Sequence, residues 1–189
     1  MHYLKIPHQH AQDILSLYEA SDEITALAEQ HQTPAAVIEV AIAAELFADT
    51  ALFLAHALPV REAIWWACCC ASQRNDWNED EANAIRSAKA WVHEPDETAR
   101  RFAEDMAKKA DLQTGAGWVA QAAFWSGGSM TAPNEPIVQP PEYLYSQAVA
   151  GAVNLIAALP DGEHATERYE HYFKLGLHIA QGGNGKLGE

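Results

Sequence analysis

The last helix expected from the sequence, residues 163–181, carries three histidines at a spacing of seven. His164, His171 and His178 share one stripe of such a helix, but neighbours lie about 10 Å apart along its axis, too far for one metal ion to bind two of them. Glu167 and His171 could share a metal ion only if another helix supplied a third ligand. We therefore expect a solvated polar face and predict no metal site.

The three cysteines are consecutive, Cys68-Cys69-Cys70. Successive helical residues diverge by about 100°, so three neighbouring thiolates cannot converge on one tetrahedral zinc ion. An odd and clustered set also cannot form a spaced disulfide framework. We expect reduced, buried thiols. The first residues show no basic segment followed by an apolar one, and the sequence therefore indicates a cytoplasmic protein.

Other patterns typical of catalysis or of ligand binding are weak. Ser126-Gly127-Gly128-Ser129 has the composition of a phosphate-binding loop, but it follows an expected helix, and anions favour helix N-termini. The sequence contains no Gly-x-Ser-x-Gly elbow and no Glu-x-x-His pair of the kind that di-iron bundles use. We predict no catalytic residue and no cofactor.

Tryptophan is the more informative residue type. Trp65 and Trp66 are neighbours in an expected helix and point to adjacent faces, so both are core residues only if that helix is contacted on two sides. Trp118 and Trp125 bound a short expected helix that ends in the glycine turn. Tryptophans of this kind pack in a core more often, yet an exposed one is a typical anchor of a protein interface. The sequence is compatible with both roles.

Capping residues and prolines place the helices that must position these side chains. Thr33-Pro34 predicts a long apolar helix to residue 58 that could break near Asp49-Thr50, and Pro59 predicts the next helix over residues 60–72. Asn78 and Glu81 have the spacing of a capping box. Further helices are expected at residues 11–19, 21–31, 78–92, 96–110, 118–125, 142–159 and 163–181.

The 189 residues are rich in alanine and poor in β-branched residues, which favours helix over strand. We therefore predict an all-α protein, an irregular multi-helix bundle or helical-hairpin array of about eight or nine helices, in a single domain over residues 1–181. Four prolines make residues 131–141 an internal loop. Residues 182–189 are expected to be disordered.

In the expected helix 96–110, Arg100 is expected to lie outside the buried stripe.

The charge balance excludes some partners. The chain has 26 acidic and 12 basic residues, a formal net charge of −14, which repels phosphate backbones and anionic membrane surfaces. We therefore expect no nucleic-acid partner. The uncharged run from residue 143 to 160 includes Ser146, Gln147 and Asn154, so we also expect no membrane insertion.

Four segments together carry a resemblance to a known family. They are Leu58-Pro59-Val60-Arg61-Glu62-Ala63-Ile64-Trp65-Trp66-Ala67-Cys68, residues 116–129 with the string Phe124-Trp125-Ser126-Gly127-Gly128-Ser129, Ala148-Val149-Ala150-Gly151-Ala152-Val153, and Glu167-Arg168-Tyr169. Over residues 50–182 the chain resembles an uncharacterised family of small proteins of Gram-negative bacteria. The resemblance implies accessory proteins associated with type VI secretion systems, and hence a cytosolic adaptor or chaperone.

Our first functional hypothesis is therefore a non-catalytic adaptor or chaperone that binds a protein partner, either a secretion-system component or an effector. The candidate binding residues are Arg61, Glu62, Trp65, Trp66, Trp118, Trp125, Ser126, Gly127, Gly128 and Ser129. An alternative is an enzyme or small-ligand-binding protein whose pocket is lined by the helix of Trp65 and Trp66, with Arg61 and Glu62 at its mouth. A third is a structural subunit that self-associates through residues 142–159.

Overall fold

The computed structural model describes residues 2–187 and confirms the all-α fold class. Within those residues there are ten α-helices and no strand. The helices are α1 (Ala11–Leu15), α2 (Asp22–Gln30), α3 (Pro34–Ala43), α4 (Phe47–Ala57), α5 (Val60–Ala71), α6 (Glu79–His93), α7 (Glu97–Ala110), α8 (Gly115–Phe124), α9 (Leu144–Ala158) and α10 (Ala165–Ala180), with a 3-10 turn, η1 (Gly162–His164), before α10.

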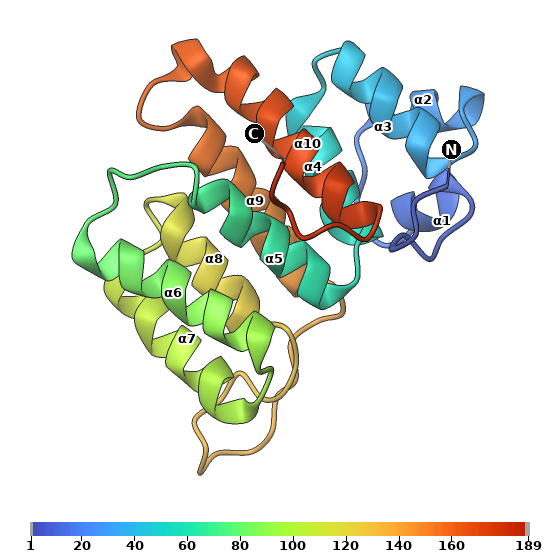
Figure 1. Ribbon diagram of the computed structural model, residues 1–189. Helices are drawn as coiled ribbons and strands as arrows, with labels where there is room; N and C mark the ends of the chain where they lie inside the picture. The colour runs from blue at the N-terminus through green and yellow to red at the C-terminus, as the bar shows by residue number, and fades with distance from the viewer. Residues whose placement is uncertain (1, 188–189) are drawn as a thin grey trace.

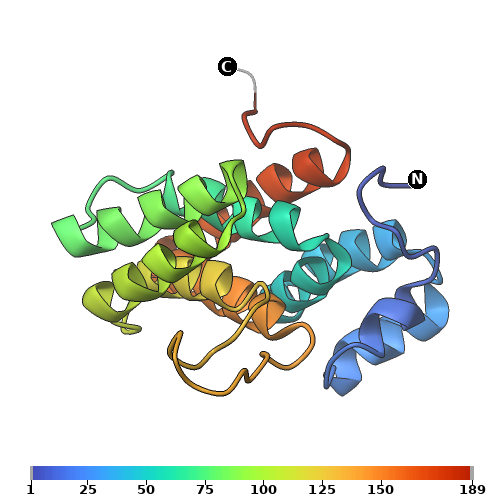
Figure 2. The ribbon, with the colours of Figure 1, turned by 90° about the horizontal axis from the view of Figure 1, so that it is seen from below.

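The helices form an irregular bundle around α9. Helix α9 contacts α4, α5, α8 and α10, so it lies in the interior of the bundle. Helices α6, α7 and α8 pack against one another at one end of the molecule, and α1, α2 and α3 lie at the other end (Figures 1 and 2). Because most of α9 is buried by its neighbours, little of the expected helix 142–159 is free for self-association.

The helix starts predicted from capping residues are confirmed. The side chains of Ser21, Thr33 and Asp96 each accept a hydrogen bond from a backbone N–H in the first turn of α2, α3 and α7. At α6 both bonds of the capping box are present: Asn78 Oδ1 accepts from Glu81 N, and Glu81 Oε2 accepts from Asn78 N, each at 2.9 Å. These bonds satisfy N–H groups that a helix cannot pair internally.

The long helix expected from residue 34 to 58 is divided, but earlier than Asp49-Thr50. Helix α3 ends at Ala43 and α4 begins at Phe47, because Glu45 adopts a left-handed backbone conformation with φ 57°. Such a conformation ends a helix, and glycine is the residue that usually adopts it. The sequence at Glu45 carries no such signal.

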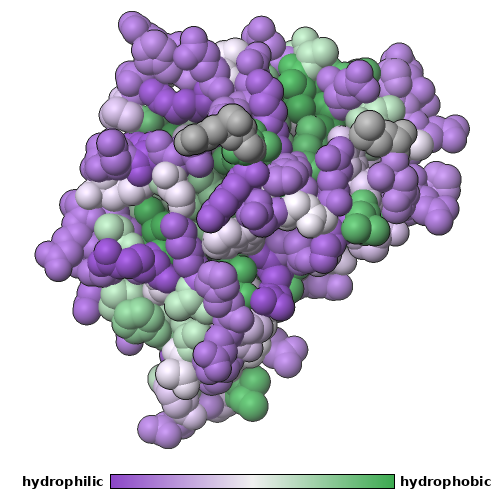
Figure 3. Space-filling model, viewed as in Figure 1, coloured by the Kyte–Doolittle hydropathy of each residue, from purple (hydrophilic) through white to green (hydrophobic). Residues whose placement is uncertain are grey.

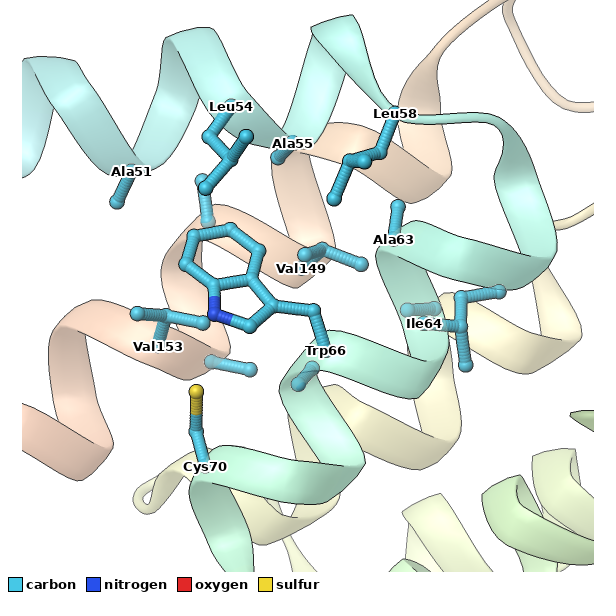
Figure 4. Close-up of a cluster of buried hydrophobic side chains, with 14 of the residues drawn as sticks. Ala51, Leu54, Ala55, Leu58, Ala63, Ile64, Trp66, Cys70, Val149 and Val153 are labelled. Carbon is cyan, nitrogen blue, oxygen red and sulfur yellow. The ribbon is translucent and has the colours of Figure 1, made fainter. Parts of the chain in front are cut away.

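The core contains Trp66, which is fully buried. Figure 4 shows its ring among Leu54 and Ala55 of α4 and Val149 and Val153 of α9. Its indole Nε1 donates to the carbonyl oxygen of Tyr172 in α10 at 2.7 Å, so the polar group of the ring is also satisfied. The side chain thereby joins three helices to α5.

The face of the molecule shown in Figure 3 is largely hydrophilic, in keeping with the many acidic residues of the chain. Apolar side chains gather there in the groove between α3 and α10. This groove has a volume of about 360 Å³ and is lined by Tyr3, Ile38, Ile42 and Leu177 among others. None of the helices within residues 2–187 combines the length and the apolar character that a membrane span requires.

The segment after α10, for which we expect disorder, makes contacts with the bundle in the residues that the structure describes. Residues 182–187 turn back from the end of α10 and run over α5. Trp65 Nε1 donates to the carbonyl oxygen of Asn184 at 2.9 Å, and Gly185 is buried. Residues 188 and 189 lie outside the described residues.

Candidate functional site

The ten candidate site residues fall into two groups, one on α5 and one at the end of α8. In the first group, Trp66 points into the core and Trp65 points to the partly exposed face, as the divergence of neighbouring helical residues predicts. Trp66 therefore has no exposed surface to offer a partner. Its burial depends on α10, which supplies both Tyr172 and Gly176, where a Cβ atom would stand 2.9 Å from the indole nitrogen.

The polar side chains on the outer face of α5 are paired within the chain. Arg61 donates from Nε and Nη2 to the carbonyl oxygen of Val92, at 3.1 and 2.6 Å, near the C-terminus of α6. Glu62 Oε1 lies 3.0 Å from Lys5 Nζ. These bonds fix the first turn of α5 to α6 and to the N-terminal segment.

A shallow hollow lies beside these residues, and it bears on the ligand-binding hypothesis. Its volume is about 270 Å³, and its lining includes Lys5, Arg61, Glu62, Trp65 and Gly182, but not Trp66. Sites for drug-sized ligands usually measure about 300–1,000 Å³ and are strongly enclosed. The hollow is smaller than that, and the polar groups expected at its mouth are already bonded to other parts of the chain.

The second group begins with Trp118 and Trp125, whose rings meet edge to face with centroids 6.1 Å apart. Both are partly buried, and Trp118 Nε1 donates to the carbonyl oxygen of Leu112 at 3.0 Å. The backbone of the α7–α8 connection comes so close to α8 that a Cβ atom on Gly117 would stand 1.7 Å from the carbonyl oxygen of Asp111. Glycine is therefore required at position 117, beside Trp118. The rings of Trp118 and Trp125 pack at this end of the bundle.

Arg100 holds the turn that contains Ser126, Gly127, Gly128 and Ser129. Its guanidinium is 4% exposed and donates to the carbonyl oxygens of Phe124 at 2.8 Å and Ser129 at 3.0 Å. Gly128 has φ +68°, and a Cβ atom there would stand 2.8 Å from Arg100 Nε. The glycine turn thus wraps around a buried arginine.

The expectation that Arg100 lies outside the buried stripe of its helix is therefore wrong. Its charge is balanced by Glu97, whose two oxygens each lie 2.7 Å from the guanidinium. Hydrogen bonds from Arg100, and next from Arg101, lower the pKa of Glu97 to about 2. The signal in the sequence was spacing: Arg100 lies three and seven residues before Ala103 and Ala107, which are both buried.

Ser129 connects this turn to the proline-rich loop, residues 131–141. Its Oγ accepts hydrogen bonds from the backbone N–H groups of Thr131 at 3.2 Å and Val138 at 3.1 Å. Two further bonds close the loop: Met130 N donates to Val138 O at 2.8 Å, and Thr131 Oγ1 donates to Pro136 O at 2.6 Å. The loop is therefore held in a fixed shape at its base.

The same loop exposes apolar side chains. Ile137 is 79% exposed, the largest value among the large hydrophobic side chains of residues 2–187, and Val138 is 46% exposed. Both residues lie in the segment that pairs with Ser129 and Met130. The prolines predict a loop here, but the tie of this loop to a distant arginine through Ser129 is not visible in its composition.

The histidines of the stripe make contacts within the chain. His171 Nε2 lies 3.1 Å from Gln73 Oε1, and His164 lies 3.7 Å from Glu167. Within the part of the chain that the structure describes, no three His, Cys, Asp or Glu side chains are grouped so that they could hold a metal ion. The three thiols are buried and free of disulfides.

Comparisons with other proteins give a family and no function. Neither a curated protein nor a solved structure matches the chain. A family model does match, over residues 37–180, which include α5, the glycine turn, the proline-rich loop and the whole of α10. The chain belongs to this family, the family of unknown function DUF6931.

Proposed function

We propose that this protein is a non-catalytic accessory protein of the cytoplasm that binds a protein partner, and that the partner contacts the loop at residues 131–141. The observation that carries the proposal is Ile137, an apolar side chain 79% exposed on a loop whose base is fixed by hydrogen bonds. Exposed apolar side chains on fixed loops are typical of binding surfaces. A fixed loop also loses little conformational entropy when it binds, so most of the burial of Ile137 and Val138 contributes to affinity.

The charge around the loop indicates the kind of surface that fits it. Glu135 and Glu142 lie in and just after the loop, both exposed, and the whole chain has a net charge of −14. Exposed carboxylates beside an apolar side chain favour a partner with an apolar pocket and basic residues at its edge. The same charge disfavours nucleic acid as the partner.

The link with type VI secretion rests on the resemblance of the four segments quoted above. Membership of a family of unknown function agrees with the uncharacterised family that these segments resemble. Within this proposal the protein acts as an adaptor or chaperone for a secretion-system component or a secreted effector.

The test is a pull-down from lysate of the source bacterium with the native chain and two variants. Ile137→Ser removes the apolar centre of the loop, and Leu4→Ser is the matched control, because Leu4 is also highly exposed, at 73%, but lies in the N-terminal segment. We expect the native chain and Leu4→Ser to retain the same secretion-system protein and Ile137→Ser to lose most of it. Equal recovery with all three chains would remove the loop as the binding surface.

A further inference from the structure

We propose that residues 182–187, which we call the C-terminal strap, occupy a peptide-binding surface on α5 and that an extended segment of the protein partner displaces them. The strap site is the surface beneath, formed by Trp65, Cys69 and Ile179. The inference rests on the proposed function only for the existence of a protein partner. Its test needs no partner, so the two proposals can fail separately.

The contacts of the strap resemble those of a bound extended peptide. A backbone carbonyl, that of Asn184, accepts the indole hydrogen bond of Trp65 at 2.9 Å. The next residue, Gly185, is buried, and a Cβ atom on it would stand 2.7 Å from Cys69 Sγ and 3.2 Å from Ile179. The site thus recognises backbone through Trp65 and admits only a small residue opposite Cys69.

The composition of the strap favours its release from the site. Three of its six residues are glycines, and glycine loses more conformational freedom on ordering than any other residue. The side chains of Asn184 and Lys186 are exposed, so they bury little apolar surface in return. The family match ends at residue 180, before the strap begins.

The strap site continues into the hollow beside Arg61 and Trp65. Gly182 and Gly183 line that hollow together with Lys5 and Val92. Removing the strap therefore joins its site to the existing hollow and produces a longer groove along the outer face of α5. An extended partner segment with a small residue opposite Cys69 fits this groove.

Cys69 reports whether the strap is in place. Cys69 is 7% exposed, whereas Cys68 and Cys70 are fully buried. Burial raises the pKa of the Cys69 thiol to about 11, so little thiolate is present at pH 8 while the strap covers it. Displacement lets water and a thiol reagent such as DTNB reach this one sulfur.

The experiment measures the rate of DTNB reaction in the full-length chain. Gly185→Val puts a β-branched side chain at φ +77° against Cys69, and we expect Cys69 to react about tenfold faster than in the native chain. Gly162→Val is the matched control, because nothing lies within 4 Å of its Cβ position, and it should react like the native chain. Adding Cys69→Ser to Gly185→Val should abolish the fast reaction.

A peptide added in trans tests whether the site binds. The hexapeptide Gly-Gly-Asn-Gly-Lys-Leu, the sequence of residues 182–187, should slow the reaction of Gly185→Val again, and the same peptide with valine in place of its last glycine, which corresponds to Gly185, should not. An unchanged rate in Gly185→Val, or a fast phase that survives Cys69→Ser, would overturn the proposal. If Gly185→Val exposes all three thiols, the rate is measured in Trp65→Phe instead, which keeps an aromatic ring but lacks the N–H donor for Asn184 O. A rate equal to that of the native chain in Trp65→Phe also overturns the proposal.

Discussion

Replacing Arg100 by methionine should destabilise the protein and release the loop at residues 131–141. In the native chain the guanidinium carbon of Arg100 lies 4.9 Å from the centroid of the Phe124 ring. Methionine keeps a long side chain over this ring but cannot donate hydrogen bonds. The carbonyl oxygens of Phe124 and Ser129 then lose the donors that Arg100 supplies. The substitution therefore tests whether a buried arginine, and not the glycines alone, fixes this turn.

The size of the effect follows from the burial of each partner. Leaving a buried carbonyl without a donor costs about 1–3 kcal/mol, and the Phe124 oxygen bears this cost in full because Phe124 is buried. Ser129 is partly exposed, so water replaces part of its lost bond. Glu97 is 62% exposed, and its lost pairing adds only about 0.5 kcal/mol. The sum is a loss of about 3 kcal/mol in the free energy of unfolding.

Urea unfolding and thermolysin digestion measure the two consequences. Thermolysin cleaves before apolar residues, so release of the loop should raise the cleavage rate at Ile137 roughly tenfold. Arg101→Met is the control, because Arg101 also pairs with Glu97 but lies at the surface and should cost about 0.5 kcal/mol. Equal destabilisation by the two variants, or a loop no more sensitive to thermolysin in Arg100→Met, would refute the reasoning.

Three further outcomes are expected in urea unfolding. Gly117→Ala should cost about 1–3 kcal/mol because its Cβ meets Asp111 O, whereas Gly151→Ala, with nothing within 4 Å, should be neutral or slightly stabilising. Trp66→Phe should cost about 2–3 kcal/mol, since it loses the bond to Tyr172 and leaves a gap. Burial lowers the pKa of His56 below its ordinary 6.5, so the unfolded chain takes up the proton first and native stability should fall as the pH drops below 6.5. His56→Phe should remove that contribution between pH 7.5 and 5.5, and an unchanged slope would contradict it.

The helices could be predicted because their signals are local. Thr33-Pro34 and the Asn78–Glu81 box use side chains within one turn of the bonds they make, so the residue types alone indicate the helix starts. The break at Glu45 could not be predicted in the same way. Its left-handed conformation lies between two helices that both pack in the core, and an ordinary glutamate adopts it there without a local sequence signal.

The roles of the candidate site residues could be predicted only in part. The divergence of Trp65 and Trp66 follows from helix geometry, but which of them is buried depends on α10, more than 100 residues later in the chain. The contacts of the strap with Trp65 and Cys69 have the same long-range origin, since both partners lie more than 100 residues earlier in the chain. Long-range contacts decide each of these cases, and no local pattern encodes them.

Four arginines of this chain donate hydrogen bonds to backbone carbonyl oxygens at or near the ends of helices. Arg61 binds the carbonyl near the end of α6, Arg100 that at the end of α8, and Arg74 and Arg168 bind Leu159 just after α9. Helix C-termini carry partial negative charge, so each arginine stabilises the end of a helix other than its own. Three of these arginines, Arg74, Arg100 and Arg168, also pair with a carboxylate of this chain. Within residues 2–187 every acidic side chain except Glu81 is at least partly exposed, and these carboxylates favour a partner whose contact surface is apolar with a basic edge.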